Sequence, residues 1–286
     1  MIDDGPAKAI AARHIKTCAP RRPPVNFARW EIQSMGEKAS AMVQHKTSKT
    51  LPAKENTAEV KAFFDQWKSY QTLIDHNYLC HREVYALLRD YLKTKFTQPF
   101  SVLDLGCGDA GFMSKTLAKT CAASYQGVDL SEMALKLAKR HFQRQSLQKN
   151  FICGDFSTFL ARNNAKRDVI WIGLSFHHLS KAQKGEFLAR SREKLNQNGV
   201  LMMFEPSNRA GESRDAYLKR WWANCKAHWT GLDAATAEEI RQHVFHADFP
   251  EPPAVLQELG RLKGFQQADI LFKDAAELYT LFCFQA

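Results

Sequence analysis

The chain has 286 residues, of which 45% are hydrophobic, including 19 Phe and 6 Trp. This supply of apolar side chains can fill a substantial core, so the composition excludes a wholly disordered or fibrous protein. The formal net charge of +10 at pH 7 raises the question of a nucleic-acid partner. No basic stripe with interleaved aromatic residues is present, however, and we expect a solvated, mildly basic surface instead.

The distribution of apolar residues and cysteines bears on the compartment. No apolar run approaches the roughly 18 to 20 residues of a membrane-spanning helix, and the N-terminus lacks the layout of a secretory signal. The 7 cysteines include no CxxC pair and no metal-ligand spacing to histidine, which is typical of free thiols in a reducing compartment. We therefore expect a soluble, cytoplasmic protein without a membrane partner, and the sequence leaves its oligomeric state open.

The N-terminal part of the chain divides into two segments. Residues 1–56 are polar and punctuated by proline, without sustained periodicity, which predicts a disordered tail. A targeting segment and an upstream start codon are alternative explanations of this stretch. From Thr57 two apolar stripes of helical spacing predict cover helices over 57–98, ahead of the first strand. The stripes are Phe63, Trp67, Tyr70 and Ile74, then Val84, Leu87, Leu88, Tyr91 and Leu92.

After these helices, short apolar runs alternate with amphipathic stretches, which predicts a parallel sheet with helices on both faces. A segment over 207–250, rich in aromatic residues, interrupts the alternation, and two final β-rich runs (FQQADILF and LYTLFCF) are close enough to pair as a hairpin. The predicted strands are 100–105, 124–129, 150–153, 168–174 and 199–205. The predicted helices are 111–121, 131–143, 180–196 and one near 252–263.

The stretch LDLGCGDAG, residues 103–111, follows the first predicted strand and contains Gly106, Gly108 and Gly111. Glycines adopt backbone angles closed to other residues and let a ligand approach the main chain. A Walker loop is excluded because no Gly-Lys-Ser/Thr is present, whereas the dinucleotide fingerprint G-x-G-x-x-G/A matches. Taken alone, this match is a weak signal for a nucleotide site.

The longer stretch VLDLGCGDAG resembles motif I of class I S-adenosylmethionine-dependent methyltransferases, in which an acid and then G-x-G follow a hydrophobic strand. The resemblance places Asp104, Gly106, Cys107 and Gly108 at the cofactor, with Asp104 near the methionine ammonium. Cys107 is more readily a small filler than a nucleophile. The implied fold is α/β: a Rossmann-like, doubly wound, seven-stranded and mostly parallel sheet with an antiparallel C-terminal hairpin, in a methyltransferase domain over 99–286.

Further matches to the family follow in chain order. YQGVDLS ends the second strand with Asp129 and Leu130, where an acid can accept both ribose hydroxyls. A helix N-cap is the alternative role for Asp129, although Ser131 could cap the same helix. FICGDF places Asp155 and Phe156 where the family binds adenine.

The stretch DVIWIGLSFHHL resembles the fourth strand and the loop that lines the transfer site, and it places Ser175 at the cofactor. Many small-molecule methyltransferases that resemble this chain carry histidines here, so His177 and His178 are candidate catalytic residues. A neutral His177 with a pKa of about 6.5 would accept a proton from the methyl acceptor. The alternative is a pair of surface residues, and no metal site is predicted because a third ligand with suitable spacing is not evident.

Two further residues have open roles. Tyr78 lies on the helix before the motif domain, where helices of this family cover the cofactor, so it is a candidate catalytic residue with core packing as the alternative. Glu205 ends the fifth strand and either bounds the acceptor site or forms an ordinary ion pair.

These matches predict methyl transfer from S-adenosyl-L-methionine to a small-molecule acceptor through an O, N, S or C nucleophile, with S-adenosyl-L-homocysteine as the product. Aromatic residues in the cover helices and in 207–250 favour an apolar or aromatic acceptor. The alternatives are a protein or RNA methyltransferase and a non-catalytic module that only binds the cofactor. The sequence does not name the acceptor.

Overall fold

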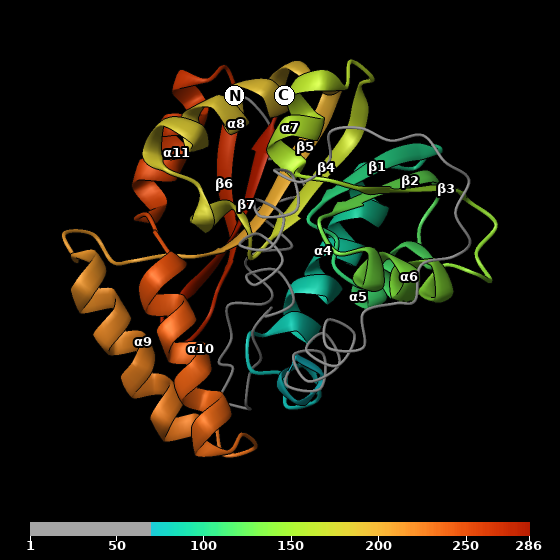
Figure 1. Ribbon diagram of the computed structural model, residues 1–286. Helices are drawn as coiled ribbons and strands as arrows, with labels where there is room; N and C mark the ends of the chain where they lie inside the picture. The colour runs from blue at the N-terminus through green and yellow to red at the C-terminus, as the bar shows by residue number, and fades with distance from the viewer. Residues whose placement is uncertain (1–69) are drawn as a thin grey trace, which may run out of the picture.

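The structure is a computed structural model and describes residues 70–286 (Figure 1). The predicted tail and the first part of the cover helices lie outside the described residues. Residues 70–75 are helical. The helices that follow are α4 (His81–Lys95), α5 (Gly111–Leu117), α6 (Glu132–His141), α7 (Phe156–Arg162), the short 3₁₀ helix η1 (Phe176–His178), α8 (Lys181–Glu193), α9 (Arg214–His228), α10 (Ala234–Ala247) and α11 (Pro253–Leu262). The strands are β1 (Phe100–Leu105), β2 (Ala122–Asp129), β3 (Gln148–Cys153), β4 (Arg167–Gly173), β5 (Leu195–Pro206), β6 (Gln267–Lys273) and β7 (Tyr279–Gln285).

All of these strands join one 7-stranded sheet in the order β3-β2-β1-β4-β5-β7-β6. The first five strands in this order pair in parallel, whereas β7 pairs antiparallel with both β5 and β6. The predicted fold, a mostly parallel seven-stranded sheet with an antiparallel C-terminal hairpin, is confirmed. The order reverses between β1 and β4, and ligands of open α/β sheets bind at the carboxyl ends of the strands at such a point.

Helices cover both faces of the sheet. In Figure 1, α4, α5 and α6 lie on one face and α7, α8 and α11 on the other. Successive side chains of a strand point to opposite faces, so Val102 and Leu103 of β1 enter different hydrophobic clusters, as do Met202 and Met203 of β5. Because both faces are buried, the central strands are nearly continuous apolar runs.

The aromatic segment forms α9 and α10, which lie side by side and extend away from the sheet in Figure 1. Ser213 and Asp233 cap the two helices by accepting hydrogen bonds from the backbone N–H groups of Ala216 and Thr236. The inner face of α9 buries Trp221, whose indole Nε1 donates to the Tyr279 hydroxyl of β7 at 2.6 Å. The aromatic segment thus packs, through α9, against β7 in the antiparallel part of the sheet.

The structure differs from the predicted elements at several boundaries and in one helix. Sequence analysis missed α7, which at 7 residues is too short to show a helical period; Asp155 is its N-cap, and the Asp155 carboxylate accepts from Thr158 N. β5 begins at Leu195 rather than at residue 199, because Leu195 already pairs with Arg167 of β4. Among the described residues, no helix is long and apolar enough to cross a membrane.

Two helical glycines give a matched test of the packing. A Cβ added to Gly260 of α11 would collide with the buried ring of Phe284, whereas one added to Gly185 of α8 would meet Lys263 Cε at 3.4 Å, an ordinary contact. We expect Gly260→Ala to lower the free energy of unfolding by about 1 to 3 kcal/mol, because overpacking outweighs the gain of about 1 kcal/mol in helix propensity. Gly185→Ala is expected to raise it. Urea denaturation measures both, and equal effects would contradict the described packing of α11.

Candidate active site

The loop after β1, residues 106–111, lies at the carboxyl edge of the sheet; we call it the glycine loop. Gly106 and Gly108 have φ of +73° and +54°, in the left-handed region that favours glycine. A Cβ added to Gly108 would meet no atom within 4 Å, so the main chain there faces open space. The N–H groups of Gly106 and Cys107 donate to Val128 O at 2.7 and 3.0 Å, which ties the loop to β2.

A pocket lies beside the glycine loop, at the ends of β1 and β4, and is called the glycine-loop pocket. Of the residues predicted to bind a cofactor, Asp104, Gly106 and Cys107 line it. The Asp104 carboxylate is buried and accepts a hydrogen bond from the Tyr125 hydroxyl at 2.8 Å. The other lining residues are Tyr70, His81, Tyr85, Asp109, Ala110, Gly111, Phe112, Trp171, Gly173, Leu174 and Phe204.

Asp129 joins the end of β2 to the glycine loop. Its carboxylate accepts from Gly108 N at 2.8 Å and from Ser131 N at 2.9 Å, and the residue is only 1% exposed. Ser131, not Asp129, is the N-cap of α6, because its hydroxyl accepts from Ala134 N. The helix-cap alternative for Asp129 is therefore wrong. A carboxylate has about four acceptor sites, so Asp129 retains capacity for a ligand.

Six of the nine predicted cofactor-binding residues do not line the glycine-loop pocket: Gly108, Asp129 and the four considered next. Asp155 is half-buried and caps α7, and Phe156 begins that helix and is buried. The Ser175 side chain is fully buried and its hydroxyl donates to Gly173 O at 3.1 Å. Leu130, beside Asp129, is half-buried. Cofactor roles for these four residues remain predictions.

The structure corrects the catalytic role expected for Tyr78. Its hydroxyl accepts a hydrogen bond from Gly231 N, and its ring stacks on Trp229 with centroids 5.3 Å apart. The side chain is buried and lines neither this pocket nor the second one described below. Tyr78 therefore belongs to the core, where it ties the N-terminal cover segment to the turn between α9 and α10.

His81, on the segment that the family resemblance places over the cofactor, lines the glycine-loop pocket, although sequence analysis gave it no specific role. It is buried between the rings of Tyr85 and Phe112, with centroids 6.0 and 5.3 Å away. Burial lowers the pKa of His81 to about 4, and the nearby Asp109 carboxylate opposes this shift only in part. His81 is therefore neutral at physiological pH.

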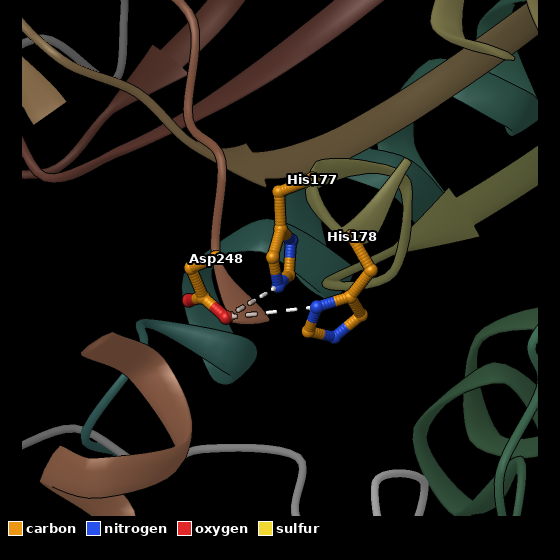
Figure 2. Close-up of side chains that lie close together, drawn as sticks. All are labelled: His177, His178 and Asp248. Atoms are coloured by element: carbon orange, nitrogen blue, oxygen red, sulfur yellow. Dashed lines mark ion pairs between the residues drawn. The ribbon is translucent and has the colours of Figure 1, made fainter. Parts of the chain in front are cut away.

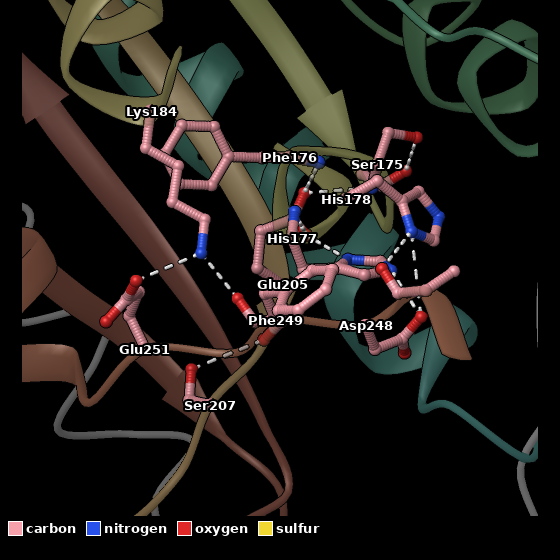
Figure 3. Close-up of polar contacts among 12 residues, drawn as sticks. Ser175, Phe176, His177, His178, Lys184, Glu205, Ser207, Asp248, Phe249 and Glu251 are labelled. Carbon is pink, nitrogen blue, oxygen red and sulfur yellow. Dashed lines mark hydrogen bonds and ion pairs between the residues drawn. The ribbon is translucent and has the colours of Figure 1, made fainter. Parts of the chain in front are cut away.

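A second pocket begins where β4 ends, and the carboxylate of Glu205 holds the backbone beside it (Figure 3). Glu205 of β5 is 1% exposed. Its Oε1 accepts from the N–H groups of Ser175 and Phe176, each at 3.1 Å, and its Oε2 accepts from His177 N at 3.2 Å. The His177 Nδ1 lies 2.6 Å from the same Oε2, so this nitrogen carries a proton and donates it.

Asp248, the residue after α10, brings a second carboxylate to the same place (Figure 2). Its Oδ1 lies 3.4 Å from His177 Nε2 and 3.6 Å from His178 Nδ1. Sequence analysis found no third residue to accompany the two histidines, and the structure supplies Asp248. No local motif marks it, because only the packing of α10 brings it next to η1.

The environment of the two histidines overturns the expectation of a neutral His177 with an ordinary pKa. Burial disfavours the cation, but the carboxylates of Asp248 and Glu205 outweigh it and raise the pKa of His177 to about 9. Burial and the neighbouring His177 cation lower the pKa of His178 to about 3. The raised pKa favours the protonated form of His177 and argues against its role as a general base at neutral pH.

This second space is called the histidine pocket. Apolar and aromatic side chains form most of its wall, and the polar groups gather on one side. Leu174, with φ of +54°, lines both this pocket and the glycine-loop pocket. The lining residues are Leu79, Leu174, His177, His178, Pro206, Trp221, His243, Val244, Asp248 and Tyr279.

Comparison with known proteins defines the class. Residues 102–199 match a family profile described as a methyltransferase domain. This region contains the glycine loop, Asp129 and both histidines of η1. Together with the fold, the match shows that residues 102–199 belong to a methyltransferase domain, which supports a class I S-adenosylmethionine-dependent enzyme.

Individual relatives are distant. An uncharacterized methyltransferase of Bacillus cereus (strain 03BB102) is 27% identical over 165 residues, which cover 56% of this chain and 72% of the relative. An O-methyltransferase family protein from Burkholderia thailandensis superposes with a TM-score of 0.55 at 13% identity, covering 89% of this chain and 70% of that one. The Burkholderia thailandensis 1,6-didemethyltoxoflavin-N1-methyltransferase superposes with a TM-score of 0.51 at 17% identity, covering 84% and 92%.

The buried, neutral His81 predicts a loss of stability in acid. Its pKa of about 4 in the folded chain lies below the value of about 6.5 in an unfolded chain, so the unfolded state binds the extra proton as the pH falls from 6.5 to 4. Between pH 6.5 and pH 4 the wild type loses free energy of unfolding because of this proton. We expect this loss to be smaller in His81→Phe by on the order of 2 to 3 kcal/mol. Urea denaturation at pH 7 and pH 4.5 measures the difference. The same pH dependence in both proteins would contradict a neutral, buried His81.

Proposed function

We propose that this enzyme transfers a methyl group from S-adenosylmethionine in the glycine-loop pocket to a small molecule in the histidine pocket. The observation that carries the proposal is the shared wall: Leu174 lines both pockets, so a donor in one would face an acceptor in the other. Holding two reactants in this geometry contributes much of the catalysis in transfers of this kind.

The residues of the glycine-loop pocket fit the cofactor. The carboxylate of Asp104 suits the ammonium group of a methionine, and the open backbone at Gly108 permits close approach of a large ligand. The N–H groups of Gly108 and Ser131 orient the Asp129 carboxylate at the edge of the loop. In this position Asp129 would also accept from the ribose hydroxyls. When bound, the cofactor supplies a methyl group already activated on a sulfonium.

The histidine pocket suits a small acceptor with an apolar or aromatic body. Trp221, Tyr279 and Val244 offer such a surface, and the carboxylates beside His177 raise the pKa of its ring, which disfavours a role as base. The chain therefore contributes alignment and exclusion of water more than proton removal. Walls of buried side chains favour a free small molecule over a protein or RNA. The structural neighbour named above, which shares the fold, was determined with the small molecule 1,6-didemethyltoxoflavin bound.

Replacement of Asp129 tests the cofactor half of the proposal. We expect Asp129→Asn to bind S-adenosylhomocysteine at least about tenfold more weakly, a difference of roughly 1.4 kcal/mol, because charged hydrogen bonds to the ribose are lost. Isothermal titration calorimetry measures the affinity. Asp233→Asn, at the exposed cap of α10, is the matched control and should bind as the wild type does. Equal affinities of the wild-type and Asp129→Asn proteins would remove Asp129 from the site.

Filling the histidine pocket tests the acceptor half. Val244 is buried in its wall, so Val244→Phe should block the acceptor and leave the cofactor site intact. We expect methyl transfer to fall at least about tenfold while affinity for S-adenosylhomocysteine is kept. Val255→Phe, on an exposed position of α11, is the control and should retain full transfer.

The assay uses S-adenosylmethionine with a labelled methyl group and a cell extract separated into metabolite, protein and RNA fractions. Label in the metabolite fraction, lost in Val244→Phe, supports the proposal. Label confined to protein or RNA would overturn the small-molecule assignment. Unchanged transfer by Val244→Phe would place the acceptor elsewhere.

A further inference from the structure

We infer that His177, His178 and Asp248 form a binding site for a divalent transition-metal ion of the zinc type, facing the histidine pocket. Each residue offers one ligand atom, and these atoms lie within 4.8 Å of one another. The inference goes beyond methyl transfer, and its test does not depend on the identity of the acceptor.

The separations of the ligand atoms match those around a metal better than those of hydrogen bonds. Asp248 Oδ1 lies 3.4 Å from His177 Nε2 and 3.6 Å from His178 Nδ1 (Figure 2). Hydrogen bonds of this type span about 2.7 to 3.2 Å. Two ligands that each lie about 2.0 to 2.1 Å from a tetrahedral zinc ion are separated by roughly 3.3 to 3.4 Å. Two of the three separations therefore suit a shared ion, and the two histidine nitrogens, which lie within 4.8 Å of each other, would have to approach to complete the site.

The oxygen at the centre of the cluster lacks a hydrogen bond. Asp248 is 7% exposed, and among the residues that the structure describes its Oδ1 has no hydrogen-bond partner. This oxygen already forms long ion pairs with His177 and His178, and a bound cation would give it a closer partner. The carboxylate of Glu205, 2.6 Å from His177 Nδ1, adds a second negative charge close to the site.

Glu205 also orients the first ligand. Because His177 Nδ1 donates to Glu205, the ring presents Nε2 toward Asp248. A carboxylate that accepts the second ring N–H of a histidine is the usual outer partner in zinc sites, where it fixes the tautomer and ring orientation. His178 Nδ1 now contacts Ala247 O at 3.1 Å and would release that contact if this nitrogen bound the metal.

The segment that carries Asp248 is held against η1 from both sides (Figure 3). Phe249 N donates to His177 O at 3.0 Å, and Arg214 Nε donates to Asp248 O at 2.7 Å. The Lys184 ammonium donates to Phe249 O and pairs with Glu251 at 3.1 Å. Asp248 and His177 are therefore positioned in advance, which a metal site requires, whereas His178 would have to exchange Ala247 O for the metal.

The donor set indicates the kind of ion. Two imidazole nitrogens and one carboxylate oxygen suit zinc and similar first-row metals better than calcium or magnesium, which prefer oxygen ligands. Three protein ligands leave a coordination position open, as in catalytic zinc sites. Such an open position would face the pocket to which we assign the acceptor.

Spectroscopic titration with Co²⁺, a zinc substitute, tests the site in full-length protein without an affinity tag. We expect one Co²⁺ per chain, with visible absorption bands that disappear when Zn²⁺ is added. Asp248→Asn and His178→Gln should each weaken binding roughly 100-fold. Glu205→Gln should weaken it about 10- to 100-fold, as expected for an outer partner. His246→Gln, at an exposed position of the same helix α10, should bind Co²⁺ like the wild type.

Thermal melting and affinity for S-adenosylhomocysteine show whether each variant is folded. Loss of Co²⁺ binding in a variant that still binds S-adenosylhomocysteine supports the metal site, whatever the outcome of the methyl-transfer assay. Absence of stoichiometric Co²⁺ binding by the wild type would overturn the inference. Undiminished binding by both Asp248→Asn and His178→Gln would also overturn it.

Discussion

The carboxylate of Glu205 fixes the backbone of residues 175–177 and the ring of His177, on which the histidine pocket depends. A buried charge is costly unless it is hydrogen-bonded, and here the backbone N–H groups of three successive residues and one imidazole N–H supply the partners. These contacts turn the chain sharply after β4 and present the histidines of η1. Further backbone hydrogen bonds, from Leu174 N to Phe204 O and from Phe249 N to His177 O, hold the same segment.

The strand order of the sheet places Glu205 and η1 close to the glycine loop. β4 lies between β1, which leads into the glycine loop, and β5, which carries Glu205. Parallel neighbours end at the same edge, so the glycine loop and η1 meet at the point where the strand order reverses. The helices α9 and α10 then close the outer side of the histidine pocket with Trp221 and Val244, and the end of α10 adds Asp248.

Local patterns were sufficient for the fold and for the position of the glycine loop after β1. Alternating apolar runs predicted the sheet, and the short motif after β1 predicted that Asp104, Gly106 and Cys107 would lie together. Residues brought in by tertiary packing could not be predicted. Asp248 is distant in the chain from the histidines it contacts, and His81 enters its pocket only through the packing of α4 against α5.

The errors share a physical cause. The pKa of His177 depends on the carboxylates of Glu205 and Asp248. Both residues are distant from His177 in the sequence, so no local motif predicts their effect. The Tyr78 hydroxyl accepts a hydrogen bond from Gly231 N in the turn after α9, and no local motif predicts this contact. A crystal structure with S-adenosylhomocysteine bound tests the central claim most directly. We expect the sulfur atom of the ligand to lie beside Leu174 and face the histidine pocket; a sulfur atom directed away from that pocket would contradict the assignment of the acceptor site.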